Sequence, residues 1–160
     1  MNAIPTAHAA TENSQYLTFM LGQEEYGVEI LMVQEIRGYT PVTPVPNTPN
    51  YVKGVMNLRG TIVPVVDLRA KLGLAEIEKN RFTVIVVVKV GAKVAGLIVD
   101  AVSDVLDLQE SEIQASPELG VQDDARYARG IARVKEKLVV LLDLEKLFCQ
   151  GDLGGPALAA

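Results

Sequence analysis

The sequence predicts a mostly β protein made of two similar small barrels or half-barrels, packed as one unit with a few short helices. Three observations support this class. The chain repeats itself internally, its apolar segments have the length and β-branched composition of short strands, and glycine or proline separates these segments. Each half is too small to be stable alone, so the two are expected to share a core.

The repeat consists of two blocks. In the first, Gly22 and Gly27 lie 69 positions before Gly91 and Gly96. In the second, a tyrosine, a glycine and a closing Asp-Leu recur 76 positions later. Chance similarity between Val-rich and Gly-rich strands is the alternative, but residues that punctuate strands recur in the same order as well as apolar ones. The second block comprises Tyr51, Gly54 and Asp67, matched by Tyr127, Gly130 and Asp143.

The first half predicts four strands and two helical segments. Alternating apolar residues in 16–21 indicate a strand with one buried face, and 22–25 is its hairpin turn. Prolines in 41–49 prevent regular pairing. Thr48 followed by Pro49 predicts a helix over 50–57, and Asp67 is expected to cap a helical turn that ends at Gly73. The other predicted strands are 26–29, 33–39 and 61–66, with a short turn at 30–32.

The second half predicts strands over 81–90, 93–102, 127–134 and 137–142, and a C-terminal helix from Asp143 to about Phe148. The polar segment 109–124 provides the additional length of this half. Residues 1–14 and 150–160 lack periodicity, so they are expected to be disordered or flexible tails around a domain at 15–149. Whether the first strand belongs to its own half or crosses to the other is left open by the sequence.

Composition excludes several classes of function. A net charge of −5 without a basic run argues against nucleic acid or an anionic membrane as partner. One Cys and one His make a zinc site improbable and exclude an internal disulfide, which fits a reducing cytoplasm. No signal peptide is apparent, and the apolar run 84–90 is far too short to span a membrane. Proteins or small molecules are the expected partners.

No constellation of catalytic residues stands out, and neither a cofactor nor a metal is expected. His8 lies in the predicted tail, and Cys149 is interpreted as a packing residue or a free thiol. Asp67 and Asp143 could form a carboxylate pair, but each precedes a leucine and a helical turn, which favours helix capping. The chain is therefore predicted not to be an enzyme.

One surface of the first half differs from its second copy. Asn57-Leu58-Arg59-Gly60 is matched by Arg133-Val134-Lys135-Glu136, so Asn57 and Gly60 have no equivalent. Arg59 is matched only by a lysine, which lacks the planar fork of donors. Arg59 is either a surface charge or intramolecular salt bridge, or a residue that recognises a partner. Gly54 does have an equivalent, Gly130, which favours close backbone approach as its reason.

These segments resemble the CheW family of bacterial chemotaxis coupling proteins. The resemblance runs from about Tyr16 to Phe148 and is most specific in Gly54-Val55-Met56-Asn57-Leu58-Arg59-Gly60 and the Pro64-containing strand behind it. Further matches are Val33-Gln34-Glu35-Ile36-Arg37-Gly38, Gly96-Leu97-Ile98-Val99-Asp100 and Leu141-Leu142-Asp143-Leu144-Glu145-Lys146-Leu147.

The resemblance implies two SH3-like five-stranded barrels and a cytoplasmic adaptor without catalysis. Its implied partners are the cytoplasmic hairpin tip of chemoreceptors and the regulatory domain of the histidine kinase CheA, with no direct membrane insertion. Exposed apolar residues of the first half are expected to bind the kinase. A domain of a larger signalling protein and a small-molecule sensor using the groove between the barrels are the alternatives. The residues expected at or near the receptor contact are Val33, Glu35, Gly54, Asn57, Arg59 and Gly60.

Overall fold

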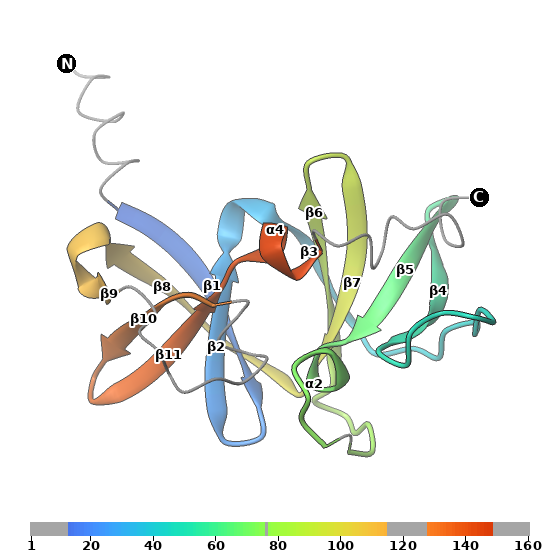
Figure 1. Ribbon diagram of the computed structural model, residues 1–160, viewed down its shortest axis with the longest axis horizontal. Helices are drawn as coiled ribbons and strands as arrows, with labels where there is room; N and C mark the ends of the chain where they lie inside the picture. Colours follow the sequence, from blue (N-terminus) through green and yellow to red (C-terminus); the bar gives the residue numbers. More distant parts are fainter. Residues whose placement is uncertain (1–12, 76, 115–127, 149–160) are drawn as a thin grey trace.

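The computed structural model describes residues 13–75, 77–114 and 128–148 of the chain. Strands dominate these residues and the helices are short (Figure 1), which confirms the mostly β class. The strands are β1 Asn13–Leu21, β2 Glu24–Glu29, β3 Val33–Gly38, β4 Val52–Leu58, β5 Thr61–Asp67, β6 Val84–Val90, β7 Lys93–Val99, β8 Ala101–Gln109, β9 Ile113–Gln114, β10 Ala128–Val134 and β11 Lys137–Leu142. The helices are η1 Ile30–Met32, α2 Leu68–Lys71, η2 Glu110–Glu112 and α4 Leu144–Leu147.

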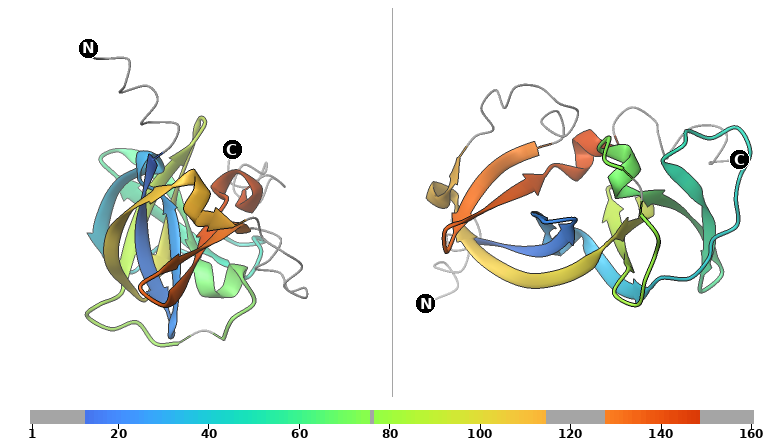
Figure 2. Two further views of the ribbon diagram at one scale, coloured as in Figure 1. Left: turned by 90° about the vertical axis from the view of Figure 1, so that its left-hand side faces the viewer. Right: turned by 90° about the horizontal axis from the view of Figure 1, so that it is seen from below.

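The strands form two sheets that exchange hairpins between the halves of the chain. The six-stranded sheet has the order β8-β1-β2-β11-β10-β9, and the five-stranded sheet has the order β3-β6-β7-β5-β4. The β1–β2 hairpin therefore joins strands of the second half, and the β6–β7 hairpin joins strands of the first. This arrangement answers the open question about the first strand, which crosses. Figure 1 shows the sheets side by side, and the view from below in Figure 2 shows α2 and α4 between them.

The parallel strand pair within each sheet has a register that corresponds to that of the other sheet. In the five-stranded sheet Val65 pairs with Gly96 in parallel, and in the six-stranded sheet Leu141 pairs with Gly27. These pairs are related by the offsets of 76 and 69 found in the sequence. In the described residues each sheet has an open strand order with two edges, and the two-residue β9 adds a sixth strand where five were expected.

The main hydrophobic cluster spans both sheets, which makes the two halves one packed unit. Phe19 and Val28 come from the six-stranded sheet, while Val86 and Leu97 come from the five-stranded sheet, and all are buried. The two α-helices close the same cluster with their leucines. Each buried side chain of this size contributes roughly 1.5–3 kcal/mol, so neither sheet can be removed without exposing a large part of the core. These leucines are Leu68, Leu144 and Leu147 in the helices and Leu72 at the C-terminal cap of α2.

The helix expected over 50–57 was wrong, because this segment is strand β4. Thr48 does not cap a helix, since its hydroxyl donates to the Val45 carbonyl at 3.0 Å. Val52 and Gly54 are instead buried at alternate positions of a strand that pairs with β5. The Thr-Pro signal was therefore overridden by period-two burial and by the available partner strand.

Other element boundaries also differ from the prediction. The strand expected over 93–102 is divided at Asp100, where the chain leaves β7 and enters β8 in the other sheet. The strand expected from residue 81 begins at Val84, because Asn80 and Thr83 form a turn. Asn13 and Ser14 belong to β1. His8, Tyr127, Cys149 and the remainder of both expected tails lie outside the described residues.

Both aspartates at the strand ends cap helices, as predicted. The Asp67 carboxylate accepts a hydrogen bond from the Arg69 N–H at 3.0 Å. The Asp143 carboxylate accepts from the N–H groups of Glu145 and Lys146 at 3.0 and 3.2 Å. These bonds satisfy donors that a helix leaves unpaired at its N-terminus, so the aspartates are explained by structure.

Candidate functional site

The six residues expected at the receptor contact come from β3, β4 and the turn between β4 and β5. β3 and β4 are the two edges of the five-stranded sheet. The chain after β3 returns to β4 through a bridge between Thr43 and Val55, with two backbone hydrogen bonds of 2.8 and 2.9 Å. This return of the chain brings the edges together and allows Glu35 of β3 to meet Arg59 of the turn.

Glu35 and Arg59 form a direct ion pair. One guanidinium nitrogen, Nη2, donates to Glu35 Oε1 at 2.7 Å, and Arg59 keeps 68% of its side chain exposed. The second oxygen, Glu35 Oε2, accepts from Arg37 Nη1 at 3.2 Å. Two arginines therefore hold one carboxylate, which leaves an excess positive charge at an exposed surface. Further Arg59 donors remain available to a partner's carboxylate or carbonyl.

Sequence reasoning missed Arg37, although a signal for it was present. A residue two positions after Glu35 in a strand points to the same face. Arg37 lies within the motif shared with the CheW family, next to the predicted site residue Glu35 on the same strand face. The alternative that Arg59 makes an intramolecular salt bridge is also supported, since the pair with Glu35 exists. The exposure of Arg59 shows that this pairing leaves most of the side chain accessible.

The turn that presents Arg59 has an uncommon backbone conformation. Arg59 and Gly60 have φ angles of +53° and +90°, the pattern of a two-residue type I′ hairpin turn. Asn57 Oδ1 accepts a hydrogen bond from the Gly60 N–H at 2.9 Å, which fixes the turn from within. The equivalent turn at Lys135 and Glu136 has φ angles of +52° and +69° without glycine or asparagine. A turn of this type therefore forms in the β10–β11 hairpin without an equivalent of the Asn57–Gly60 pair.

Gly54 and Val33 are not part of this exposed surface. Gly54 is buried, and a Cβ atom added there would lie 2.1 Å from the Thr43 carbonyl oxygen. A residue without a side chain is therefore required here, because the backbone at Thr43 lies so close to Gly54. The glycine at the matching position, Gly130, led to the same expectation. Val33 is half-buried and packs against the main hydrophobic cluster. The structure brings Glu35, Arg59, Asn57 and Gly60 together, while Gly54 and Val33 support the strands beneath them.

An exposed apolar side chain lies close to this group. Ile62 is exposed and pairs with Asn57 directly across the β4–β5 hairpin. Ile36 of β3 is also exposed, but it points to the opposite face of the strand from Glu35 and Arg37. An exposed isoleucine beside a partly paired arginine is a combination typical of protein-binding surfaces. Exposed apolar residues were expected in this half from the family resemblance, although the sequence did not identify which ones.

The Glu35 carboxyl should report the ion pair in solution. Its hydrogen bond with Arg59 is the main cause that holds the pKa of Glu35 below its ordinary value, with Arg37 as a further contributor. Replacing Arg59 by alanine should therefore raise the pKa of Glu35 toward the ordinary value. Carboxyl-detected NMR titration of both proteins measures this change directly. An unchanged Glu35 titration in Arg59→Ala would show that the pair does not persist in solution.

In the part of the chain that the structure describes, no helix is long and apolar enough to cross a membrane. No group of three or more histidine, cysteine, aspartate or glutamate side chains in those same residues is arranged to hold a metal ion.

Known proteins resemble this chain over most of its length. Residues 15–151 match the family model described as the CheW-like domain. A chemotaxis protein CheW from Klebsiella aerogenes is 44% identical over 143 residues, covering 89% of this chain and 86% of that protein. A chemotaxis protein CheW from Rhizobium meliloti is 39% identical over 141 residues, covering 88% of this chain and 91% of that protein.

A solved structure shows the same fold. The crystal structure of the scaffolding protein TtCheW from Thermoanaerobacter tengcongensis superposes with a TM-score of 0.79 and 34% sequence identity. The match covers 84% of this chain and 92% of that one. The resemblance inferred from the central motif is thereby confirmed, and the chain belongs to the family of CheW-like domains.

Proposed function

We propose that this chain is a chemotaxis adaptor that couples chemoreceptors to the histidine kinase CheA and has no catalytic activity of its own. Its family membership supports the adaptor role, because relatives are named chemotaxis protein CheW and the structural neighbour is described as a scaffolding protein. The single structural observation that carries the proposal is the exposed Arg59, held by Glu35 at the end of a fixed hairpin turn. The adaptor is cytoplasmic and joins receptor arrays through its partners.

The receptor surface consists of Glu35, Asn57, Arg59 and Gly60. A helical hairpin tip lays apolar side chains beside Ile62, and Arg59 donates to a carboxylate or backbone carbonyl at the edge of the contact. The hydrogen bond from Gly60 to Asn57 limits the motion of the turn, so less conformational freedom is lost on binding. Val33 and Gly54 contribute by holding β3 and β4 in place.

The kinase binds a different part of the first half. Exposed apolar residues there include Leu31 in η1 and Ile36 in β3. The regulatory domain of CheA covers such residues, while the receptor takes the Arg59 turn. Contacts of the order of 1 μM, or about −8 kcal/mol each, suffice because simultaneous engagement in an array strengthens the assembly.

The two sheets are proposed to be the two SH3-like halves of an internal repeat. Three matches support this interpretation. The strand orders correspond, the parallel registers correspond, and the matching strands β4 and β10 each carry an irregularity before a glycine, Gly54 or Gly130. The carbonyl of Thr43 approaches Gly54 as the carbonyl of Gln114 approaches Gly130.

Replacing Arg59 by alanine tests the receptor surface. Kinase activation in the presence of receptor should fall about tenfold, as expected when an arginine that donates charge-assisted hydrogen bonds to the partner is truncated. The free energy of unfolding should change by less than about 1 kcal/mol, because the ion pair is exposed. The measurement is autophosphorylation of the cognate CheA-like kinase with a receptor cytoplasmic fragment, with and without this protein.

Arg81→Ala is the matched control, since it removes the same charge from an exposed position outside the receptor surface. It should retain activation. Equal losses of stability and activation in Arg59→Ala would favour a purely structural salt bridge. Failure of the folded wild type to activate any kinase would favour the small-molecule sensor, which a metabolite alone should stabilise against heat.

A further inference from the structure

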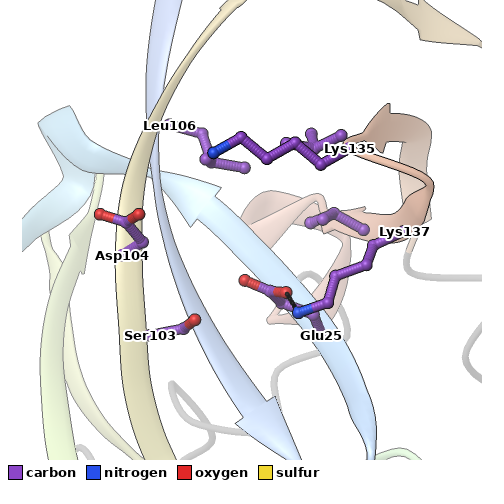
Figure 3. Close-up of a pocket in the computed structure, with 8 residues that line it drawn as sticks. Glu25, Ser103, Asp104, Leu106, Lys135 and Lys137 are labelled. Atoms are coloured by element: carbon purple, nitrogen blue, oxygen red, sulfur yellow. Dashed lines mark ion pairs between the residues drawn. The ribbon is translucent and has the colours of Figure 1, made fainter.

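A pocket of about 280 Å³ opens in the six-stranded sheet, away from the receptor surface. Its apolar wall is formed by Leu106, Val134 and Val139, which also belong to or pack against the hydrophobic cluster of this sheet. Charged groups surround the opening. Figure 3 shows Asp104 on β8 on one side, with Glu25 and Lys137 opposite and Lys135 reaching across from the turn. The lining residues are Glu25, Ser103, Asp104, Leu106, Val134, Lys135, Lys137 and Val139.

The pocket occupies the position that corresponds to the Arg59–Glu35 pair in the other sheet. The offset of 69 relates Asp104 to Glu35 and Leu106 to Arg37, and the offset of 76 relates Lys135 to Arg59. Strand pairing supports this correspondence. In the five-stranded sheet Glu35 pairs with Val87, and Arg37 pairs with Ile85. In the six-stranded sheet Asp104 pairs with Thr18, and Leu106 pairs with Tyr16. Thr18 and Tyr16 lie 69 positions before Val87 and Ile85 in the sequence.

In the five-stranded sheet two guanidinium groups occupy the corresponding space. Arg59 and Arg37 both donate to the Glu35 carboxylate. In the six-stranded sheet a leucine replaces Arg37, and within the described residues no ion pair joins Lys135 to Asp104. Among the described residues, Asp104 Oδ1 accepts a hydrogen bond from the backbone N–H of Val105 at 2.8 Å. The carboxylate is thus retained, whereas a leucine stands in place of one arginine and Lys135, which forms no ion pair with Asp104 in the described residues, stands in place of the other.

A second carboxylate strengthens the preference for a cation. Glu25 also lines the pocket, its side chain is only 10% exposed, and its position corresponds to the apolar Val94 in the other sheet. Lys137 pairs with Glu25 at 3.6 Å, which is longer than the Arg59 pair. Lys137 keeps 68% of its side chain exposed, so it can move away toward solvent when another donor enters.

We propose that this pocket receives an arginine side chain presented by a partner protein. The aliphatic stem of that arginine lies along Leu106, Val134 and Val139, and its guanidinium donates to Asp104 and Glu25. The incoming group thereby supplies the interaction that Arg37 and Arg59 supply internally in the five-stranded sheet. This surface is distinct from the proposed receptor surface, so either assignment can fail without the other.

The test is an NMR titration of the full chain with the blocked tripeptide Ac-Gly-Arg-Gly-NH2. Amide shifts in Ser103, Asp104, Leu106 and Val134 should saturate with a dissociation constant on the order of 1 mM. The matching lysine peptide should bind more weakly, because it has no planar fork, and the glutamate peptide should not bind. Equal or stronger binding of the lysine or glutamate peptide would overturn the arginine assignment.

Two variants separate recognition from folding. Asp104→Asn should weaken binding of the arginine peptide about tenfold while leaving the remaining amide spectrum unchanged. Leu106→Arg introduces the residue found at the corresponding position 37, which should pair with Asp104 and block the pocket. Retained peptide binding in Asp104→Asn would refute the proposal, whether or not Leu106→Arg folds.

Discussion

Replacing Gly54 by alanine is expected to reduce the free energy of unfolding by about 3 kcal/mol or more. The added Cβ would meet the Thr43 carbonyl oxygen at 2.1 Å and its carbon at 2.6 Å. These are backbone atoms, held in place by two hydrogen bonds between Thr43 and Val55. The φ angle of +151° adds strain for any residue with a side chain. Chemical denaturation followed by circular dichroism measures the loss.

Gly60→Ala provides a matched comparison in the same hairpin. Gly60 also has a positive φ, +90°, but a Cβ there has no atom within 4 Å. Its cost should therefore be limited to backbone strain, about 1–2 kcal/mol. The difference between the two variants isolates the clash with Thr43. If Gly54→Ala were no more destabilising than Gly60→Ala, the close backbone approach would not exist in solution.

This comparison also separates two reasons why Gly54 could affect signalling. A direct receptor contact would weaken binding in a protein that remains folded. The buried position of Gly54 instead predicts that signalling declines with the folded fraction. Residual activity per folded molecule should therefore stay close to wild type in Gly54→Ala, whereas in Arg59→Ala it should fall without unfolding.

Much of the fold follows from the sequence because strand periodicity and turn residues are local signals. The β6–β7 hairpin consists of alternating and β-branched residues on either side of Gly91. Its prediction therefore needed no knowledge of contacts with residues far away in the sequence. The prediction of a helix over 50–57 failed because Thr48 and Pro49 resemble the start of a helix. The segment forms a strand because β5 is available as its pairing partner. Asp100 divides one expected strand into two because the chain changes sheets there, and no local pattern marks such a crossing.

The six residues of the candidate site were predicted from the motifs shared with the CheW family. Comparison with the second copy had also singled out Asn57 and Gly60, which have no equivalent there, and Arg59, which is matched only by a lysine. The structure joins Asn57 and Gly60 by a hydrogen bond. The contact of Arg59 with Glu35 depends on how the sheet edges meet, which sequence offsets cannot supply. The correspondence between Leu106 and Arg37 rests on the strand registers, in which Leu106 pairs with Tyr16 and Arg37 pairs with Ile85, and local sequence patterns do not supply these registers.

The second large effect is expected at Arg69 and Asp100, which fasten the two sheets together. Arg69 Nε and Nη2 donate to the two Asp100 oxygens at 3.0 and 2.7 Å, and Nη1 donates to the Ala75 carbonyl at 2.7 Å. The Gly22 N–H in the β1–β2 turn donates to Asp100 Oδ2 at 2.7 Å. Asp100 thus connects α2, which follows the five-stranded sheet, to a hairpin of the six-stranded sheet.

Arg69→Met should therefore cost about 2–3 kcal/mol of the free energy of unfolding, because it leaves a half-buried carboxylate without its cation. The side chains of Arg69 and Asp100 are only 13% and 21% exposed. A double-mutant cycle with Asp100→Asn should give a coupling energy of at least about 1.5 kcal/mol. The side chains of Arg129 and Glu29, which also form an ion pair, are 37% and 28% exposed. Their coupling energy in the same kind of cycle should therefore be less than about 1 kcal/mol.

The stabilising effect of Asp100 should disappear at acidic pH. Burial alone raises the pKa of Asp100, but the hydrogen bonds from Arg69 and Gly22 outweigh it and hold the pKa below the ordinary value of 3.8. A carboxyl with a lowered folded-state pKa contributes stability that is complete above its unfolded pKa and is lost as pH falls through the folded value. Wild type and Asp100→Asn should therefore differ most near neutral pH and converge below pH 3.8. A stability difference that stays constant through this range would show that Asp100 acts through packing or its neutral hydrogen bonds, and that its charge does not join the sheets.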